Sequence, residues 1–319
     1  MNSTVFQETF QRLSAEIEKA IVGQPDLVHG LLVAVVAGGH VLIEGAPGLG
    51  KTLVVRALSQ VSGLGFKRVQ FTPDLMPGDV TGSSIYDRQT GGFTFVPGPV
   101  FTQLLLADEI NRAPAKTQSA LLEAMQEHQV TTDATTRALP RPFLVIATQN
   151  PIESQGTYPL PEAQLDRFLL KLTMQNPPAD VEAEIVKRHA AGFDPQELSH
   201  LEAVAKDAEL IAMGKLALRV RIDDAVTRYI VDLVGRTRND RQLELGASPR
   251  ASISMLRTAQ VVAAAAGRDF VTPDDVKAMA RPVLRHRVLL HPDAELQGIT
   301  VEERIEDILR SAPVPRVAS

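Results

Sequence analysis

Residues 45–52 read Gly-Ala-Pro-Gly-Leu-Gly-Lys-Thr and fill the pattern Gly-x-x-x-x-Gly-Lys-Thr of a phosphate-binding loop. Two glycines, Gly48 and Gly50, leave room for the backbone to approach phosphate oxygens. Lys51 places a positive charge near the β and γ phosphates, and the hydroxyl of Thr52 is suited to hold Mg²⁺. The pattern therefore predicts nucleotide contacts from Gly45, Ala46, Pro47, Gly48, Leu49, Gly50, Lys51 and Thr52.

The segments around this loop have the character that phosphate binding requires. A buried strand before the loop and a helix after it make backbone N–H groups and the positive end of the helix converge on the phosphates. Residues 41–43, Val-Leu-Ile, form an apolar run typical of a strand buried on both faces. After Thr52, apolar residues recur at helical spacing up to Val61. A chance glycine-rich turn is the alternative, and both flanking segments count against it.

Two further apolar runs end in polar residues that suit hydrolysis. The run at 104–107 ends in Asp108, which can bind Mg²⁺ directly or through water, and Glu109, which can polarise an attacking water. Paired acids are also common at solvated strand ends, but a phosphate loop upstream favours the catalytic interpretation. The run at 143–147 is followed by Asn150, whose neutral amide can position water against the γ phosphate. An Asn-Pro pair is otherwise an ordinary turn signal.

Arg167 lies between apolar residues in the segment Leu-Asp-Arg-Phe-Leu at 165–169. Two interpretations are open. Such an arginine is usually structural, and Asp166 would then be its ion-pair partner. Alternatively, Arg167 reaches the nucleotide of a neighbouring subunit and stabilises negative charge in the transition state.

Composition limits the class of protein. The chain has 319 residues, 44% of them hydrophobic and 22% charged, which predicts two globular domains. The absence of cysteine excludes disulfides, thiolate metal sites and a cysteine nucleophile. Acidic residues among residues 1–19 argue against a secretory signal, and the longest apolar stretch, residues 31–43, is too short to span a bilayer. We therefore expect a soluble cytoplasmic protein without a membrane span.

The hydrophobic pattern divides the chain in two. Amphipathic helices are predicted at 4–20 and 26–37, a strand at 66–71, and a helix at 111–128. A long Gly- and Pro-rich segment, 72–99, contains a predicted hairpin at 83–96, and a second hairpin is predicted at 129–141. No strand-like run is recognised after residue 176, where helix starts are predicted at Asp223, Ser248-Pro249 and Thr272-Pro273.

Together these segments resemble the MoxR family of AAA+ ATPases over nearly the whole chain. The resemblance implies an α/β fold, with a three-layer αβα P-loop core and a parallel sheet at 1–175, including an N-terminal helix. An all-α helical lid at 176–319 would follow, with nucleotide bound between core and lid and at a subunit boundary. The segments that carry the resemblance are Ile21-Val22-Gly23-Gln24, the phosphate loop, 70–75, 104–126, 147–151, 159–168 and Ser248-Pro249-Arg250.

The resemblance also implies roles for individual residues. Val22, Gly23 and Leu53 would join the ATP contacts. The hairpin at 83–96 matches an insertion in the second helix of the core, and the hairpin at 129–141 matches one that precedes the sensor strand. The catalytic set would be Lys51 and Thr52 as the Walker A pair, Asp108 and Glu109 as the Walker B pair, Asn150 as sensor 1, Arg167 as the arginine finger acting in trans, and Arg250 as the sensor-2 arginine acting in cis.

By resemblance, the protein hydrolyses ATP with Mg²⁺ in a homo-oligomeric ring, expected to be a hexamer. Hydrolysis would drive chaperone-like remodelling, assembly or metal-cofactor insertion in a client, alongside a von Willebrand factor A domain protein. Three alternatives remain: a DNA-acting AAA+ motor, a slow nucleotide-dependent assembly scaffold, and the ATPase subunit of a metal chelatase. A net charge of −5 and only 4% aromatic residues argue against a nucleic-acid partner.

Overall fold

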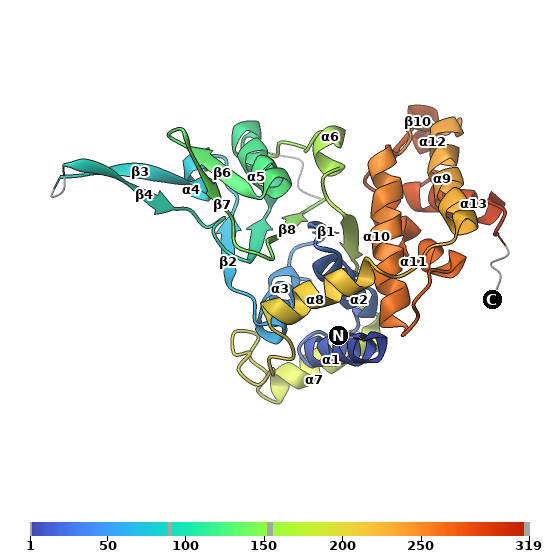
Figure 1. Ribbon diagram of the computed structural model, residues 1–319, viewed down its shortest axis with the longest axis horizontal. Coiled ribbons are helices and arrows are strands. Elements are labelled where there is room, and N and C mark those ends of the chain that lie inside the picture. The colour runs from blue at the N-terminus through green and yellow to red at the C-terminus, as the bar shows by residue number, and fades with distance from the viewer. Residues whose placement is uncertain (1, 89–90, 152–155, 316–319) are drawn as a thin grey trace.

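The computed structural model describes residues 2–88, 91–151 and 156–315. A five-stranded parallel sheet with the strand order β2-β5-β8-β1-β9 lies at its centre (Figure 1). The middle strands begin as aliphatic runs, and every residue of β5 is buried, as expected where helices cover both faces of a sheet. The strands are β1 (Val41–Gly45), β2 (Phe66–Gln70), β5 (Leu104–Asp108), β8 (Leu144–Gln149) and β9 (Leu170–Met174).

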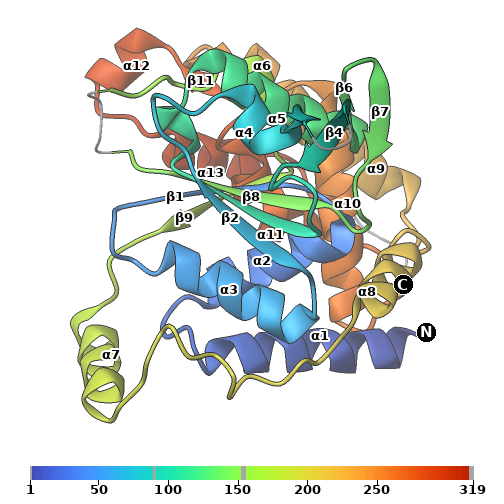
Figure 2. The same cartoon turned by 90° about the vertical axis from the view of Figure 1, so that its left-hand side faces the viewer.

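Helices cover the two faces of the sheet and make three layers (Figure 2). Alternate strand residues face opposite sides, so Leu104 and Leu106 belong to one core, whereas Leu105 and Ala107 belong to the other. The expected αβα fold is confirmed. The first core is covered by α1 (Ser3–Glu18), α2 (Pro25–Ala37) and α3 (Lys51–Ser62), and the second by α4 (Pro77–Thr81) and α5 (Ala115–Glu127), with α6 (Glu162–Leu165) beside them.

The helix predicted at 111–128 is shorter than expected. A 3₁₀ turn, η1 (Ile110–Arg112), comes first, and α5 starts only at Ala115. Pro114 accounts for the break, because it disfavours helical backbone at the preceding residue, and Ala113 is extended with ψ of 153°.

Both predicted hairpins are confirmed, and the second lies against the first. Strands β3 (Gly82–Asp87) and β4 (Gly92–Pro97) form the first, which projects far from the sheet (Figure 1). Strands β6 (Gln129–Thr132) and β7 (Thr135–Ala138) form the second. The guanidinium of Arg137 lies 3.8 Å from the ring centroid of Phe95, which ties one hairpin to the other.

The C-terminal region is helical, and the predicted N-caps at Asp223, Ser248 and Thr272 are all confirmed. One expectation is wrong in detail, because Leu243 and Leu290 pair in a short antiparallel ladder. Its strands are too short to show a two-residue hydrophobic period. The elements are α7 (Ala179–Ala190), α8 (Asp207–Ala217), α9 (Asp224–Asn239), β10 (Leu243–Leu245), α10 (Pro249–Ala265), α11 (Pro273–Leu284), β11 (Leu289–Leu290), α12 (Pro292–Leu296) and α13 (Val301–Ser311).

The helical region is packed tightly onto the core. Helix α2, which covers the sheet, also contacts α8 and α10, and one continuous apolar cluster joins all three. A domain boundary at residues 175 and 176 therefore stays a prediction. In the part of the chain that the structure describes, no helix is long and apolar enough to cross a membrane.

Candidate active site

The phosphate loop runs from the end of β1 into α3. Gly48 and Gly50 have φ of +84° and +90°, in the left-handed region that favours glycine. A Cβ at either position would meet nothing within 4 Å, so backbone conformation, and not lack of space, calls for glycine here. Gly45 differs, because a Cβ there would lie 2.9 Å from Cβ of Met174 on β9.

Lys51, the first residue of α3, bends back over the loop. Its Nζ donates a hydrogen bond to the carbonyl of Gly45 at 2.7 Å and lies 3.4 Å from the carbonyl of Gln149. These carbonyls end β1 and β8, so the ammonium lies above the carboxyl ends of the two strands. That is the position from which a lysine reaches the β and γ phosphates.

A cavity of about 750 Å³ opens beside the loop. Pro47, Gly48, Leu49 and Gly50 form its phosphate-binding rim. An apolar wall beside a row of backbone N–H groups fits a nucleotide, whose base prefers apolar contacts and whose phosphates prefer N–H donors. The wall comes from Ile21, Val22, Leu53, Met174 and Ile185, so the predicted contacts of Val22 and Leu53 lie in this cavity.

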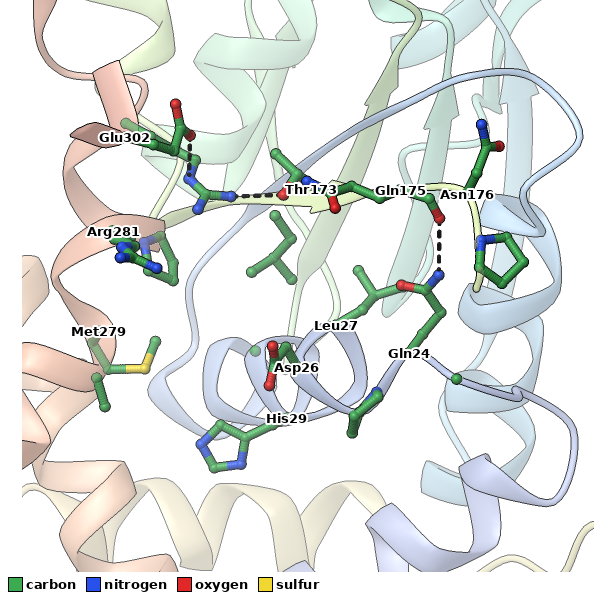
Figure 3. A pocket seen from close by; sticks show the side chains of 18 of the residues that line it. Gln24, Asp26, Leu27, His29, Thr173, Gln175, Asn176, Met279, Arg281 and Glu302 are labelled. Atoms are coloured by element: carbon green, nitrogen blue, oxygen red, sulfur yellow. Dashed lines mark hydrogen bonds and ion pairs between the residues drawn. The ribbon is translucent and has the colours of Figure 1, made fainter. Parts of the chain in front are cut away.

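Gly23 lines an adjoining cavity of about 650 Å³, shown in Figure 3, which shares Gln24 with the first. The side-chain amide of Gln24 donates to the carbonyl of Gln175 at 3.2 Å. From the helical region, α11 and α13 border this cavity. There Arg285 donates to the hydroxyl of Thr173 at 2.9 Å and lies 3.4 Å from Glu302. The helical region therefore contacts β9 close to its carboxyl end.

The two acids lie where β5 ends, and each is held by several partners. Arg68 on β2 donates to Asp108 Oδ2 at 2.7 and 3.1 Å. The hydroxyl of Thr148 donates to Asp108 Oδ1 at 2.5 Å and accepts a hydrogen bond from the backbone N–H of Glu109 at 2.9 Å. Thr148 thereby fixes both acids relative to β8. Asn150, one residue beyond β8, is buried at 5% exposure.

Glu109 has a left-handed backbone with φ of 55°, which costs about 1–2 kcal/mol for a residue with a Cβ. The hydrogen bond to Thr148 helps to hold this conformation. The carboxylate accepts from the amide of Gln70 at 2.6 Å and from Arg112 at 3.0 Å. It is thus aimed along the carboxyl edge of the sheet and not into the core.

The donor set suits Mg²⁺ bound together with a nucleotide. The hydroxyl of Thr52 and the carboxylate of Asp108 are oxygen ligands, which Mg²⁺ prefers; Thr52 lies in the first turn of α3, and Asp108 is the last residue of β5. Both oxygens of Asp108 already accept hydrogen bonds, so its contact with the ion through a bound water fits best. Among the residues described, no three His, Cys, Asp or Glu side chains are grouped so that they could hold a metal by themselves.

Arg167 and Arg250 lie at the opposite edge of the sheet. Val41 pairs with Leu170 and Gly45 with Met174, so Arg167, which precedes β9, belongs to the amino ends of the strands. The five residues of β9 span about 16 Å, which separates this edge from the phosphate loop. Both arginines line one hollow of about 280 Å³, and neither is among the described residues that line the cavity beside the loop.

This placement bears on the roles expected of both arginines. Arg250 lies at the edge of the sheet opposite the phosphate loop of its own chain, because the start of α10 is joined to the amino edge, so its expected action in cis does not fit this arrangement. Of the two interpretations left open for Arg167, the ion pair with Asp166 is excluded, because the carboxylate of Asp166 binds Arg287 at 2.7 Å and the hydroxyl of Ser248 at 2.9 Å. Within the described chain, the Arg167 guanidinium makes no hydrogen bond or ion pair.

Sequence reasoning missed three residues that shape the site: Arg68, Thr148 and Arg287. Thr148 had a signal, since it precedes Asn150 at the end of a buried strand. Arg68 and Arg287 had none, because strand order and domain docking bring them to Asp108 and Asp166.

Comparisons with known proteins agree with this geometry. Residues 40–170 match the ATPase family associated with various cellular activities (AAA), and residues 235–308 match the AAA lid domain. A crystal structure of a Cytophaga hutchinsonii protein, provisionally assigned as an ATPase, superposes with a TM-score of 0.90. It is 40% identical, over 98% of this chain and 97% of that one. Fold, phosphate loop and lid define an ATPase of the AAA+ class.

Relatives that match over most of their length identify the family within this class. The chain is 43% identical to the chaperone MoxR1 of Mycobacterium tuberculosis, over 97% of this chain and 83% of the relative. It is 47% identical to the uncharacterized protein YeaC of Bacillus subtilis, over 94% and 92% respectively. The chain belongs to the MoxR family of AAA+ ATPases.

Proposed function

We propose that this protein binds ATP with Mg²⁺ at the carboxyl edge of its sheet and hydrolyses it to ADP and phosphate, and that a neighbouring copy completes each active site. The proposal extends to a homo-oligomeric ring, expected to be a hexamer, that remodels or assembles a client protein. Insertion of a metal cofactor, alongside a protein with a von Willebrand factor A domain, is the specific form that family membership favours.

The residues of the carboxyl edge divide the chemistry among them. Lys51 binds the β and γ phosphates, while Thr52 and Asp108 hold the ion. Bound Mg²⁺ would offset phosphate charge. Glu109 accepts the proton of the attacking water, and Asn150 aligns that water with the γ phosphorus.

One observation supports the shared site most directly. The groups that bind ATP and activate water lie at one edge of the sheet, and the two arginines suited to transition-state charge lie at the other. A single chain thus carries the two halves of the proposed site at opposite edges of its sheet. Joining the amino edge of one copy to the carboxyl edge of the next would bring Arg167 and Arg250 to the neighbour's nucleotide, so Arg250 is proposed to act in trans.

Steady-state ATPase rate, measured against protein concentration, tests the shared site. The ATPase rate per subunit should rise with protein concentration as the ring assembles. When Arg167→Ala subunits are mixed with wild type, the rate should fall by more than the fraction of wild-type subunits that they replace. If the rate per wild-type subunit depended on neither protein concentration nor the fraction of mutant subunits, each chain would hydrolyse ATP alone. The remodelling proposal would then give way to a monomeric switch.

A further inference from the structure

Arg287 follows α11 in the lid and is almost completely buried, with 1% of its side chain exposed. Burial lowers its pKa, and the hydrogen bond and charge of Asp166 oppose that shift. A buried guanidinium is costly unless its donors are satisfied. Here they are satisfied mainly by the segment that carries Arg167.

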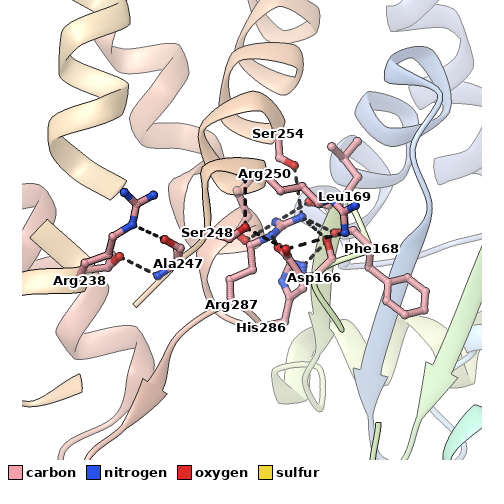
Figure 4. Close-up of polar contacts among 12 residues, drawn as sticks. Asp166, Phe168, Leu169, Arg238, Ala247, Ser248, Arg250, Ser254, His286 and Arg287 are labelled. Carbon is pink, nitrogen blue, oxygen red and sulfur yellow. Dashed lines mark hydrogen bonds and ion pairs between the residues drawn. The ribbon is translucent and has the colours of Figure 1, made fainter. Parts of the chain in front are cut away.

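Arg287 contacts the residues that precede and follow Arg167 in the chain: Asp166, Phe168 and Leu169 (Figure 4). Its Nε donates to Asp166 Oδ1 at 2.7 Å, and its Nη2 donates to the carbonyl of Phe168 at 2.5 Å. Its Nη1 donates to the carbonyl of Leu169 at 3.1 Å. The backbone on each side of Arg167 is therefore fixed by one planar group from the lid, whereas the Arg167 side chain itself makes no hydrogen bond within the described chain.

The same network fixes the start of α10, where Arg250 lies. The hydroxyl of Ser248, the N-cap residue, donates to Asp166 Oδ2 at 2.9 Å, and Nη1 of Arg250 lies 3.9 Å from that oxygen. Arg287 Nη2 also lies 3.2 Å from the hydroxyl of Ser254, one helical turn further along α10. Asp166 thus accepts a hydrogen bond from Arg287 on one carboxylate oxygen and from Ser248, at the N-terminus of α10, on the other.

We propose that Arg287 is the positioning residue that sets Arg167 and Arg250 as one rigid unit toward the nucleotide of the neighbouring subunit. This inference rests on the proposed function. A guanidinium is needed because its planar fork offers five donors in fixed directions, whereas a lysine has three on a flexible chain. A lysine here keeps the charge but cannot hold Asp166, Phe168 and Leu169 together.

The main test is complementation between Arg287→Lys and Glu109→Gln subunits. Arg287→Lys should lower kcat about 100-fold, as expected when reactive groups are misplaced by about 1 Å, with an unchanged nucleotide dissociation constant. Co-expressed rings should be more active than either variant alone. The Glu109→Gln neighbour supplies well-placed arginines to an intact carboxyl edge. A defect confined to the subunit's own site would not be rescued in this way.

A double-mutant cycle gives a second readout. If Arg287 acts through Arg167, then Arg287→Lys should reduce kcat little further in an Arg167→Ala background. Arg268→Lys is the matched control, since Arg268 binds Asp275 at 2.5 and 2.7 Å inside the lid. It should lower the melting temperature without lowering kcat. Should Arg287→Lys fail to assemble, Asp166→Asn removes the shared carboxylate and carries the same test.

Complementation by Arg167→Ala with Glu109→Gln separates the two proposals. If that pair regains activity and Arg287→Lys with Glu109→Gln does not, the positioning role is overturned while the shared site stands. If neither pair regains activity, the shared site itself is refuted. Equal loss from Arg287→Lys in wild-type and Arg167→Ala backgrounds would also overturn the inference, since Arg287 would then act independently of Arg167.

Discussion

The two edges of the sheet are built differently. At the carboxyl edge, the groups proposed to bind phosphate and Mg²⁺ and to activate water lie at the end of a strand or begin the helix after it. At the amino edge, Arg167 and Arg250 come from the core and the lid, and the buried contacts of Arg287 hold their segments together. Local geometry places the first set, whereas domain docking places the second.

This difference determines which subunit should lose activity when a residue at either edge is substituted. A change at the carboxyl edge should affect the subunit that carries it, because ATP binding and water activation are proposed to occur there. A change at the amino edge should affect the next subunit. The following substitutions test this difference between the two edges, in order from the largest expected effect to the smallest.

Lys51→Ala should have the largest effect. It removes the charge held over Gly45 and Gln149, and losing charged hydrogen bonds to two phosphates should weaken ATP binding about 100-fold or more. Titration with a fluorescent ATP analogue measures this. Lys171→Ala is a matched control, because Lys171 pairs with Glu44 at 2.6 Å on the neighbouring strand and is not in the loop. Equal weakening by both would contradict the assignment of Lys51.

Glu109→Gln should bind ATP normally but hydrolyse it about 100- to 10,000-fold more slowly, the usual contribution of a general base. Single-turnover hydrolysis, with ATP binding measured in parallel, separates the two steps. The exposed residue Glu295, changed to Gln, should leave both unchanged. Normal turnover in Glu109→Gln would move the role of base to another group.

Thr148→Val should lower kcat about 10-fold, because it removes the hydroxyl between Asp108 and Glu109 without changing the side-chain shape. Thr148→Ser, which keeps the hydroxyl, should retain most of the activity. If the valine and serine variants matched each other, packing and not hydrogen bonding would explain the residue. Neither variant should be rescued by a Glu109→Gln neighbour, in contrast to variants of the amino edge.

The amino edge should also make stability depend on pH. Burial lowers the pKa of His40 from 6.5 to about 4, and its Nδ1 accepts a hydrogen bond from the N–H of Val145 at 3.0 Å. Below pH 6.5 the imidazole of His40 is protonated in the unfolded chain but stays neutral in the folded chain down to about pH 4, so the free energy of unfolding falls as pH falls. The contribution lost between pH 7 and pH 5 is about 2 kcal/mol.

Urea unfolding of wild type and His40→Gln at both pH values measures that loss. Glutamine offers a donor and an acceptor but does not titrate, so the variant should lose about 2 kcal/mol less than wild type between pH 7 and pH 5. Burial also lowers the pKa of His286, which acts in the same direction and remains in both proteins. Equal losses in wild type and variant would exclude His40 as a source of the acid sensitivity.

Much of this protein could be read from its sequence. The phosphate loop, the acids at the end of β5 and both hairpins follow from spacing and hydrophobic pattern, because strand ends and tight turns are local properties. The N-caps of α9, α10 and α11 were likewise predicted. The strand pair β10-β11 was not, since two or three residues are too few to show a period.

Tertiary structure alone decided the rest. Asp166 stands beside Arg167 in the chain, which suggested an ion pair, yet its carboxylate turns to Arg287 and Ser248 in the lid. Docking of α10 at the amino edge likewise places Arg250 away from the phosphate loop of its own chain. The sequence identified the residues of the carboxyl edge because each lies at the end of a recognisable buried strand or in the loop that follows it. The amino edge depends on burial of a charged group between two domains, and no local pattern encodes which partner that charge will find.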